Sequence, residues 1–288
     1  MHKKSSNAFQ VFLILLFSIL GLMIILPFFH LIAKAFSSEV AVISGGVKFW
    51  PVGFQLDVLN FVVHNRNFLQ ALFNSVVVTV IGTFVSMAAT TLAAYPLSKP
   101  SFRGRRGFLL LFAFSMVFYG GIVPSYLLVK SLGLLDTLWA QILPFVVIQF
   151  NLFIMKTFFE GIPESIEESA RIDGAGNLTI LLRIVLPISA PVLATVGLFY
   201  AVHYWNSYYH AMLFVSKPEV KPLQLYLYEL INSAQNISEI VSAEQAMNVT
   251  PMGVQSATIV VSTLPILILY PFLQKYFMHG LTVGSVKG

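Results

Sequence analysis

Long apolar runs alternate with short polar segments along the chain. Six runs reach the length of about 20 residues that carries a helix across the hydrocarbon core of a bilayer. They cover Phe9 to Ile32, Ala71 to Leu97, Phe108 to Val129, Leu138 to Phe159, Leu186 to Phe214 and Ala257 to Phe277. The runs are continuous, without the period-2 alternation of barrel strands, and a helix satisfies its own backbone hydrogen bonds in lipid. The pattern therefore predicts an all-α membrane protein with six transmembrane helices.

Prolines and loops subdivide this pattern. Proline lacks a backbone N–H and crowds the preceding helical turn, so it bends a helix. We expect kinks rather than helix ends at five positions, namely Pro27, Pro124, Pro144, Pro191 and Pro265. Two sizeable loops, Ser37 to Phe68 and Val215 to about Val254, separate runs, and the second contains a predicted short helix over Leu223 to Ile231.

Composition supports the membrane assignment. Hydrophobic residues make up 57% of the 288 and charged residues only 10%, whereas about a quarter of residues in soluble domains are charged. The mean hydropathy is +0.81. The chain has no cysteine, which excludes disulfides, thiolate catalysis and cysteine metal sites. We therefore expect an integral membrane protein in contact with lipid, with no nucleic-acid partner.

The basic residues predict the orientation. With the N-terminus inside, eleven of the lysines and arginines lie on the cytosolic side and six outside, which accounts for all 17. This excess predicts that both termini are cytosolic. The first run exceeds the usual apolar core of a signal peptide, so we expect it to be retained as the first span. The basic cluster Lys99 to Arg106 is expected to bind lipid headgroups and anchor the topology.

The acidic residues and the absent motifs limit the chemistry. All twelve acids fall in predicted loops or at span ends, whereas ion-coupled transporters hold ionisable groups near the bilayer midplane. No phosphate-binding loop, H-E-x-x-H pattern or G-x-S-x-G elbow occurs, so we expect neither an ATP site nor catalytic residues nor a metal site. A transporter of this kind needs an energy source outside the chain.

The segment after the fourth run is strongly polar. Pro163 stands at a predicted helix start, and Gly174 stands at its end. Glu167 and Arg171 are four residues apart in the favourable order for an ion pair. A second short helix is expected from near Asn177 up to Pro187. The sequence thus predicts an exposed angled pair of short helices.

The spacing of this segment resembles the EAA loop of ATP-binding-cassette (ABC) importer permeases. Glu168-x-Ala170, then Gly174, then Ile184 and the pair Leu186-Pro187 follow the family pattern, with Ser169 in place of one family alanine. The resemblance implies a cytosolic coupling loop over residues 160–187 that docks on a separate ATPase. The coupling residues it implies are Glu168, Ala170, Asp173, Gly174, Ile184, Leu186 and Pro187.

The final span and tail extend the resemblance to essentially the whole chain. The run Thr258 to Pro265 and the segment from Gln274 to Gly288 are similar to carbohydrate-uptake permeases of the maltose-permease-G-like, LplC/YtcP-type branch. This resemblance implies the ABC type I importer permease fold. It also implies a first helix and external loop in residues 1–67, a permease domain with helices 2–6 in 68–276, an external loop over 215–254, and a cytosolic tail in 277–288. Gly280, Gly284 and Lys287 of the tail would touch the ATPase.

The same resemblance implies the partners. A homologous second permease, two ATPase subunits or a homodimer of one, and an extracytoplasmic solute-binding protein would complete the transporter. ATP and Mg would bind on the ATPase subunits, and this chain would hold no cofactor. The location implied is the bacterial cytoplasmic membrane, with a multi-pass topology.

Six polar or aromatic residues within the runs are candidates to line the substrate path: Tyr119, Gln149, Asn151, Trp205, Asn206 and Tyr209. Aromatic rings with polar edges suit sugars, which present apolar faces and hydroxyls. An interfacial aromatic belt explains the segment around Trp205 equally well. Hydrogen bonds between helices are the other explanation for Gln149 and Asn151.

These observations predict a permease subunit of an ABC importer for a sugar, more specifically an oligosaccharide. Two alternatives remain at this level. One is an ABC permease for another solute, such as a peptide, an amino acid or a polyamine. The other is a secondary transporter or channel that needs no ATPase.

Overall fold

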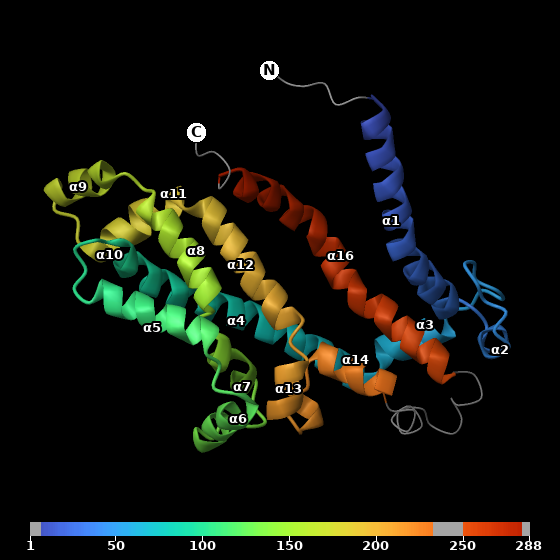
Figure 1. Ribbon diagram of the computed structural model, residues 1–288. Coiled ribbons are helices and arrows are strands. Elements are labelled where there is room, and N and C mark those ends of the chain that lie inside the picture. The colour runs from blue at the N-terminus through green and yellow to red at the C-terminus, as the bar shows by residue number, and fades with distance from the viewer. Residues whose placement is uncertain (1–6, 233–249, 284–288) are drawn as a thin grey trace. The chain divides into compact units, whose positions relative to one another are not determined.

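The computed structural model describes residues 7–232 and 250–283, with side chains described for 9–232 and 250–268. Every regular element in these ranges is helical (Figure 1). Two compact units divide the chain, one formed by residues 1–69 and 227–265 and the other by 70–226 and 266–288. We call them the first and the second unit.

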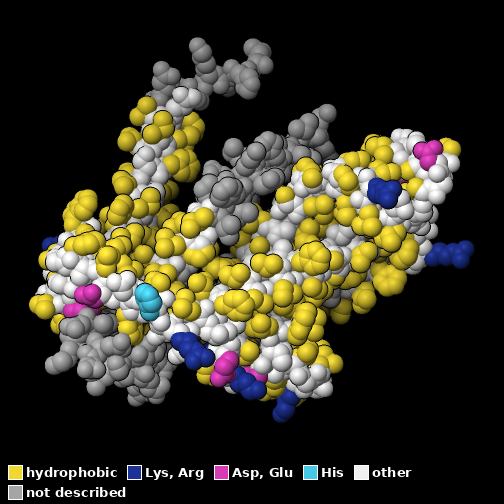
Figure 2. Space-filling model, turned by 180° about the vertical axis from the view of Figure 1, so that it is seen from behind, with side chains coloured by type: hydrophobic (Ala, Val, Ile, Leu, Met, Phe, Trp, Pro, Cys, Tyr) yellow, Lys and Arg dark blue, Asp and Glu magenta, His cyan; other side chains and the backbone are white. Residues whose placement is uncertain are grey.

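Three uninterrupted helices are long and apolar enough to cross a membrane. They are α1 (Asn7–Ala35), α4 (Arg66–Ser98) and α16 (Pro251–Val283). Hydrophobic side chains cover most of the face in Figure 2, where charged side chains are few. In α1, the most apolar stretch contains no buried residue. Such surfaces suit lipid or another apolar partner.

Three further spans are each built from two helical pieces that meet at a bend. In the first pair, α5 (Arg105–Val117) and α6 (Ile122–Ser131) are bent by 117°. In the second pair, α7 (Trp139–Ile142) with η1 (Leu143–Phe145) and α8 (Gln149–Glu160) are bent by 50°. In the third pair, Asn177–Ile188 and α12 (Ala190–Trp205) are bent by 86°. Counting each bent pair as one span gives the six predicted spans. The all-α fold is thus confirmed, with three to six candidate spans.

The expected effect of three prolines was wrong. Pro124 and Pro191 stand in the first turn of the helix that follows a bend, and Pro144 stands in η1, just before the bend between η1 and α8. The N–H groups of a helix's first turn have no carbonyl acceptor within that helix, so a proline, which lacks the N–H, is accepted there. The long apolar helix of the predicted fifth run, α12, therefore starts at Ala190 rather than Leu186. Pro27 and Pro265 do lie inside continuous helices, as predicted.

In the first unit a buried acid joins the start of α2 (Glu39–Ile43) to the start of α16. Besides parts of the long helices the unit contains α2 and α3 (Asp57–His64). Glu39 is buried, and its Oε2 accepts a hydrogen bond from the backbone N–H of Thr250 at 2.7 Å. A carboxylate at this place also complements the positive end of α16.

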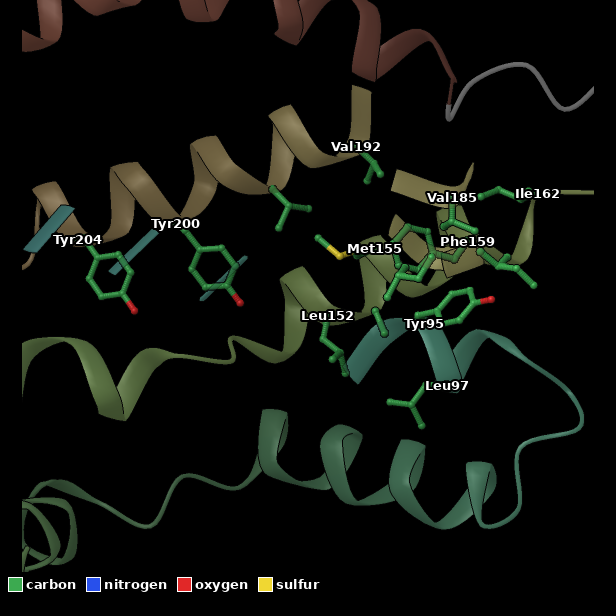
Figure 3. Packing of buried hydrophobic residues seen from close by; sticks show 14 of the residues in the cluster. Tyr95, Leu97, Leu152, Met155, Phe159, Ile162, Val185, Val192, Tyr200 and Tyr204 are labelled. Carbon is green, nitrogen blue, oxygen red and sulfur yellow. The ribbon is translucent and has the colours of Figure 1, made fainter. Parts of the chain in front are cut away.

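The core of the second unit lies where α8, α12 and α4 meet. Leu152 and Met155 of α8 are fully buried beside Val196 of α12, and Phe159 packs edge-on against Tyr95 of α4 (Figure 3). Within a membrane such contacts stabilise through close packing, because lipid is as apolar as the side chains. The connection from α12 continues through α13 (Tyr209–Phe214) and η3 (Pro218–Val220) to α14 (Leu223–Asn232), the short helix expected there.

Two tyrosines of α12 supply hydrogen-bond partners for backbone groups at the break between α7 and α8. The Tyr204 hydroxyl donates to the carbonyl of Ile142 at 3.2 Å, and the N–H of Ile148 donates to the Tyr200 hydroxyl at 3.0 Å. Ser86 and Thr90 of α4 hold the same hydroxyls at 2.7 and 2.6 Å. A broken helix leaves backbone groups that lipid cannot satisfy, so these hydroxyls make the break possible.

We predict that Tyr200→Phe destabilises the protein by about 1–3 kcal/mol, because it leaves the Ile148 N–H and the Thr90 hydroxyl without their buried partner. Thermal unfolding of the purified protein in mild detergent measures the effect. Tyr119→Phe is the matched control, since the Tyr119 side chain is exposed. Equal unfolding midpoints for Tyr200→Phe and the control would contradict the prediction.

A single carboxylate ties the turn before α7 to the segment after α13. Asp136 accepts hydrogen bonds from the backbone N–H groups of Ser216 at 2.5 Å and Lys217 at 3.0 Å. Its own N–H donates to the carbonyl of Phe214 at 2.9 Å. The hydrogen bonds from Ser216 and Lys217 stabilise the charged form and lower the pKa of Asp136 from its ordinary value of 3.8.

The stabilisation from Asp136 should therefore depend on pH. A carboxyl whose folded pKa is depressed contributes fully above its unfolded pKa and loses its contribution as the pH falls through the folded pKa. We expect Asp136→Asn to lower the unfolding midpoint at neutral pH, and the difference from wild type to shrink below pH 3.8. Glu219→Gln, in the same segment, is the control. A difference that is independent of pH would contradict the assigned hydrogen bonds.

Candidate functional site

The polar segment after α8 folds into a short helix with a tight stop. Helix α9 (Glu164–Ile172) begins after Pro163, with Glu164 and Glu167 in its first turn, as the sequence predicts. Gly174 has φ +82°. The N–H of Ala175 donates to the Ala170 carbonyl at 2.9 Å and that of Gly174 to the Arg171 carbonyl at 3.0 Å. This pair of hydrogen bonds around a left-handed glycine is the Schellman ending of a helix.

Two neighbouring acids of α9 have opposite environments. The Glu168 side chain is exposed, whereas Glu167 is only 4% exposed. The Glu167 carboxylate pairs with the Lys99 ammonium and accepts a hydrogen bond from the Tyr95 hydroxyl at 3.3 Å. The predicted pair with Arg171 is present at 3.8 Å. The expectation that the helix faces are exposed is therefore wrong for Glu167 and for the buried Ala170.

A second ion-pair group lies at the end of α8. Arg105 donates from Nη2 to Glu160 at 2.5 Å and from Nε to the Leu97 carbonyl at 2.9 Å. Lys156 pairs with the same Glu160 oxygen at 2.6 Å. Lys99 and Arg105 thus pair with acids of the chain itself, because the loop folds back onto the end of α4. The expected contact of this basic cluster with lipid headgroups stays a prediction.

Two cavities are lined by Lys99. One, of about 240 Å³, is also lined by Ser101, Glu164, Glu168 and Arg171. The other, of about 230 Å³, is also lined by Phe159, Glu160 and Ile162. The ion pairs around α9 therefore have open space beside them rather than a filled core.

The second arm of the loop packs inward. It consists of α10 (Asn177–Ile180), the π-helical turn η2 (Leu181–Val185) and α11 (Leu186–Ile188). The expected short helix is present, but its middle turn is π-helical. Ile184 and Leu186 are half-buried against the core of the second unit, and Pro187 is exposed. Asp173 and Gly174 are exposed at the tip between the two arms.

The six candidates for the substrate path are spread over α8, α12, α13 and the connections beside them. Asn151 is buried on α8, and Gln149 at its start donates to Ser115 at 3.2 Å. Trp205 is buried at the end of α12, and its indole N–H has no partner among the described residues. Asn206 donates to the Val202 carbonyl at 3.0 Å. Tyr209, like Tyr119 between α5 and α6, is exposed.

No hydrogen bond within the described ranges joins one of these six residues to another. Of the tail residues, Gly280 lies within α16, and Gly284 and Lys287 lie outside the described residues. The residues that sequence reasoning missed are Lys99, Arg105 and Glu160. The sequence did contain a signal for them. A basic cluster follows the second apolar run and acidic residues follow the fourth, so segments of opposite charge lie at the ends of two spans.

Comparison with known proteins identifies close relatives. Residues 79–283 match the family described as "Binding-protein-dependent transport system inner membrane component". Protein LplC of Bacillus subtilis (strain 168) is 43% identical over 291 residues, which cover 100% of this chain and 98% of that protein. The polygalacturonan/rhamnogalacturonan transport system permease protein YtcP of the same organism is 43% identical over 93% of this chain and 94% of its own length.

A solved structure supports the same relationship. A crystal structure of a bacterial ABC transporter involved in the import of the acidic polysaccharide alginate contains a similar chain, with a TM-score of 0.88 and 34% sequence identity. The match covers 96% of this chain and 99% of that one. The type I importer permease fold, and the resemblance to carbohydrate-uptake permeases, are thereby confirmed.

Gly174 allows a direct test of the helix stop. Adding a Cβ there meets no atom within 4 Å, but the left-handed backbone costs an L-residue about 1–2 kcal/mol. Gly176 is equally open but has φ −74°. We predict that Gly174→Ala accelerates hydrogen exchange at the Gly174 and Ala175 amides, and that Gly176→Ala does not. Equal exchange in the two variants would show that the Schellman stop does not depend on Gly174.

Proposed function

The chain belongs to the family of binding-protein-dependent transport system inner membrane components, and we propose on that basis that it is one permease subunit of an ATP-driven importer that carries an oligosaccharide into the cell. It is a transport component rather than an enzyme, and its apolar helices place it in the cytoplasmic membrane as a multi-pass protein. In the proposed orientation both termini are cytosolic.

The exposed tip of the loop over residues 160–187 carries the proposal. Helix α9 presents Glu168 outward while Glu167 and Ala170 hold the helix to the chain's own core. We assign Glu168, Asp173, Gly174 and Pro187 to the contact with an ATPase subunit, because their side chains or backbone are exposed there. Ala170, Ile184 and Leu186 then support that surface from the core side. Gly280, Gly284 and Lys287 remain candidates for a tail contact.

The proposed complex contains this chain, a homologous second permease, two ATPase subunits or a homodimer of one, and an extracytoplasmic solute-binding protein. ATP and Mg bind on the ATPase subunits in this proposal, and the permease chain needs no cofactor of its own. A family named for its dependence on a binding protein supports the last partner. Closure of the ATPase would move α9, and α9 would move the spans.

Relatives support a carbohydrate as the substrate. YtcP is named for polygalacturonan and rhamnogalacturonan transport, and the solved relative for import of the acidic polysaccharide alginate. We extend this class of substrate to the present chain, as an oligosaccharide. We place the substrate path along the six candidate residues Tyr119, Gln149, Asn151, Trp205, Asn206 and Tyr209.

No observation favours a transporter that works without an ATPase. Among the residues whose side chains are described, only Glu39 and Glu167 are buried acids. Glu39 lies at the start of a short helix, and Glu167 lies in the loop. Neither is within a span, where an ion-coupled carrier places its carboxylates.

We predict that the chain co-purifies from its native membrane in mild detergent with an ATPase and a second permease. The Glu168→Ala/Gly174→Pro double variant should lose the ATPase, because it removes the exposed acid and forces φ away from +82°. The second permease should remain bound, because both substitutions lie in the exposed part of the loop. Reconstituted wild-type complex should take up oligosaccharides, neutral or containing uronic acids, only with ATP and a solute-binding protein. A chain that transports without an ATPase would overturn the proposal.

A further inference from the structure

The Glu167 carboxylate joins two elements that are far apart in the sequence. It belongs to α9, yet it binds Lys99 just after α4 and Tyr95 in the last turn of α4. The Lys99 ammonium also lies 5.1 Å from the centre of the Tyr95 ring. The side chains of Lys99 and Glu167 are 18% and 5% exposed. The pair is therefore largely shielded from water, and separating it would leave a buried charge without a partner.

A second ion pair also connects the end of α4 to the region around α9. Glu160, at the end of α8, holds Arg105 at the start of α5, and Arg105 in turn donates to the Leu97 carbonyl of α4. Only residues 161–163 separate the end of α8 from the start of α9. The last turn of α4 thus lies between two charged contacts, one to each end of this short link.

The two acids in the middle of α9 lie on different faces of the helix. Successive residues of a helix point about 100° apart, and here Glu168 is exposed while its neighbour Glu167 is turned to α4. A partner that displaces the exposed face of α9 must therefore also displace the Glu167 carboxylate. The covalent path from α9 to α12 is less direct, because it passes through the Gly174 turn, the π-helical η2 and the 86° bend before Ala190.

We propose that Glu167 and Lys99 are positioning residues for transport: their ion pair makes α9 and the end of α4 move as one body, so that the drive applied to the loop reaches α4 directly. This inference rests on the proposed ATP-driven function. The cavities of about 240 and 230 Å³ beside Lys99 give the paired side chains room to move together without a collision. Tyr95 and Arg171 keep the Glu167 carboxylate oriented during that movement.

The first test measures coupling in the complete, reconstituted transporter. Glu167→Gln and Lys99→Met should each lower the sugar transported per ATP hydrolysed by about tenfold while the ATPase stays bound. The exchanged pair Lys99→Glu/Glu167→Lys should recover most of that loss. Glu164→Gln is the matched control, because Glu164 lies on the same helix, is exposed, and forms no ion pair among the described residues. Wild-type coupling in both single variants would overturn the inference.

A second measurement does not depend on how well the exchanged pair assembles. The chain has no cysteine, so spin labels can be placed at Ser165→Cys on α9 and Leu92→Cys on α4, both exposed. In the wild-type complex the distance between the labels should be the same with and without bound ATP. With Glu167→Gln added, the distance should change on ATP binding. A wild-type distance that changes with ATP would show that the two elements move separately, and would overturn the inference.

The outcomes separate this inference from the function on which it rests. A wild-type chain that binds no ATPase, or that transports without ATP, overturns the proposed function and the inference together. A wild-type complex that imports sugar with ATP, with unaltered coupling in Glu167→Gln and Lys99→Met, overturns the ion-pair inference alone.

Discussion

The need to satisfy backbone hydrogen bonds away from water governs this structure. An uninterrupted helix meets that need within itself, but three of the candidate spans are helix pairs bent at a break. A break leaves N–H and C=O groups outside the helical hydrogen-bond pattern, and lipid cannot satisfy them. Between α7 and α8 the missing partners are the hydroxyls of Tyr200 and Tyr204, held in place by Thr90 and Ser86. The contact between α4 and α12 therefore stabilises the break as well as the packing.

The absence of water around the spans also explains where the charged residues lie. With only 10% of residues charged, the chain keeps its carboxylates out of the spans and uses the most buried of them as links between elements. Glu39 joins the start of α2 to the start of α16, and Glu167 joins α9 to the end of α4. An exposed ion pair would contribute little, whereas these contacts determine how one element is held to another. The proposed transmission of motion from α9 to α4 depends on that property.

Much of the candidate site could be predicted from local rules. Pro163, the acids of the first turn and Gly174 predict where α9 begins and ends, because capping and the left-handed stop depend on neighbouring residues alone. The partner of Glu167 could not be predicted in this way. Lys99 lies 68 residues earlier, and a basic cluster after a span is equally typical of an anchor for lipid headgroups. Only the tertiary structure, in which the end of α4 lies against α9, shows that Lys99 is the partner of Glu167.

The sequence by itself determined the class of protein, the EAA-type loop and its family, because these depend on apolar length, helix signals and motif spacing within one stretch of chain. The tertiary structure alone decided that Pro124, Pro144 and Pro191 stand at breaks rather than kinks, that Glu167 faces inward while Glu168 faces outward, and that Ile184 and Leu186 pack on the chain's own core. The physical reason is that burial and hydrogen-bond partners are supplied by residues distant in the sequence. A break in a span is tolerated only where such partners exist.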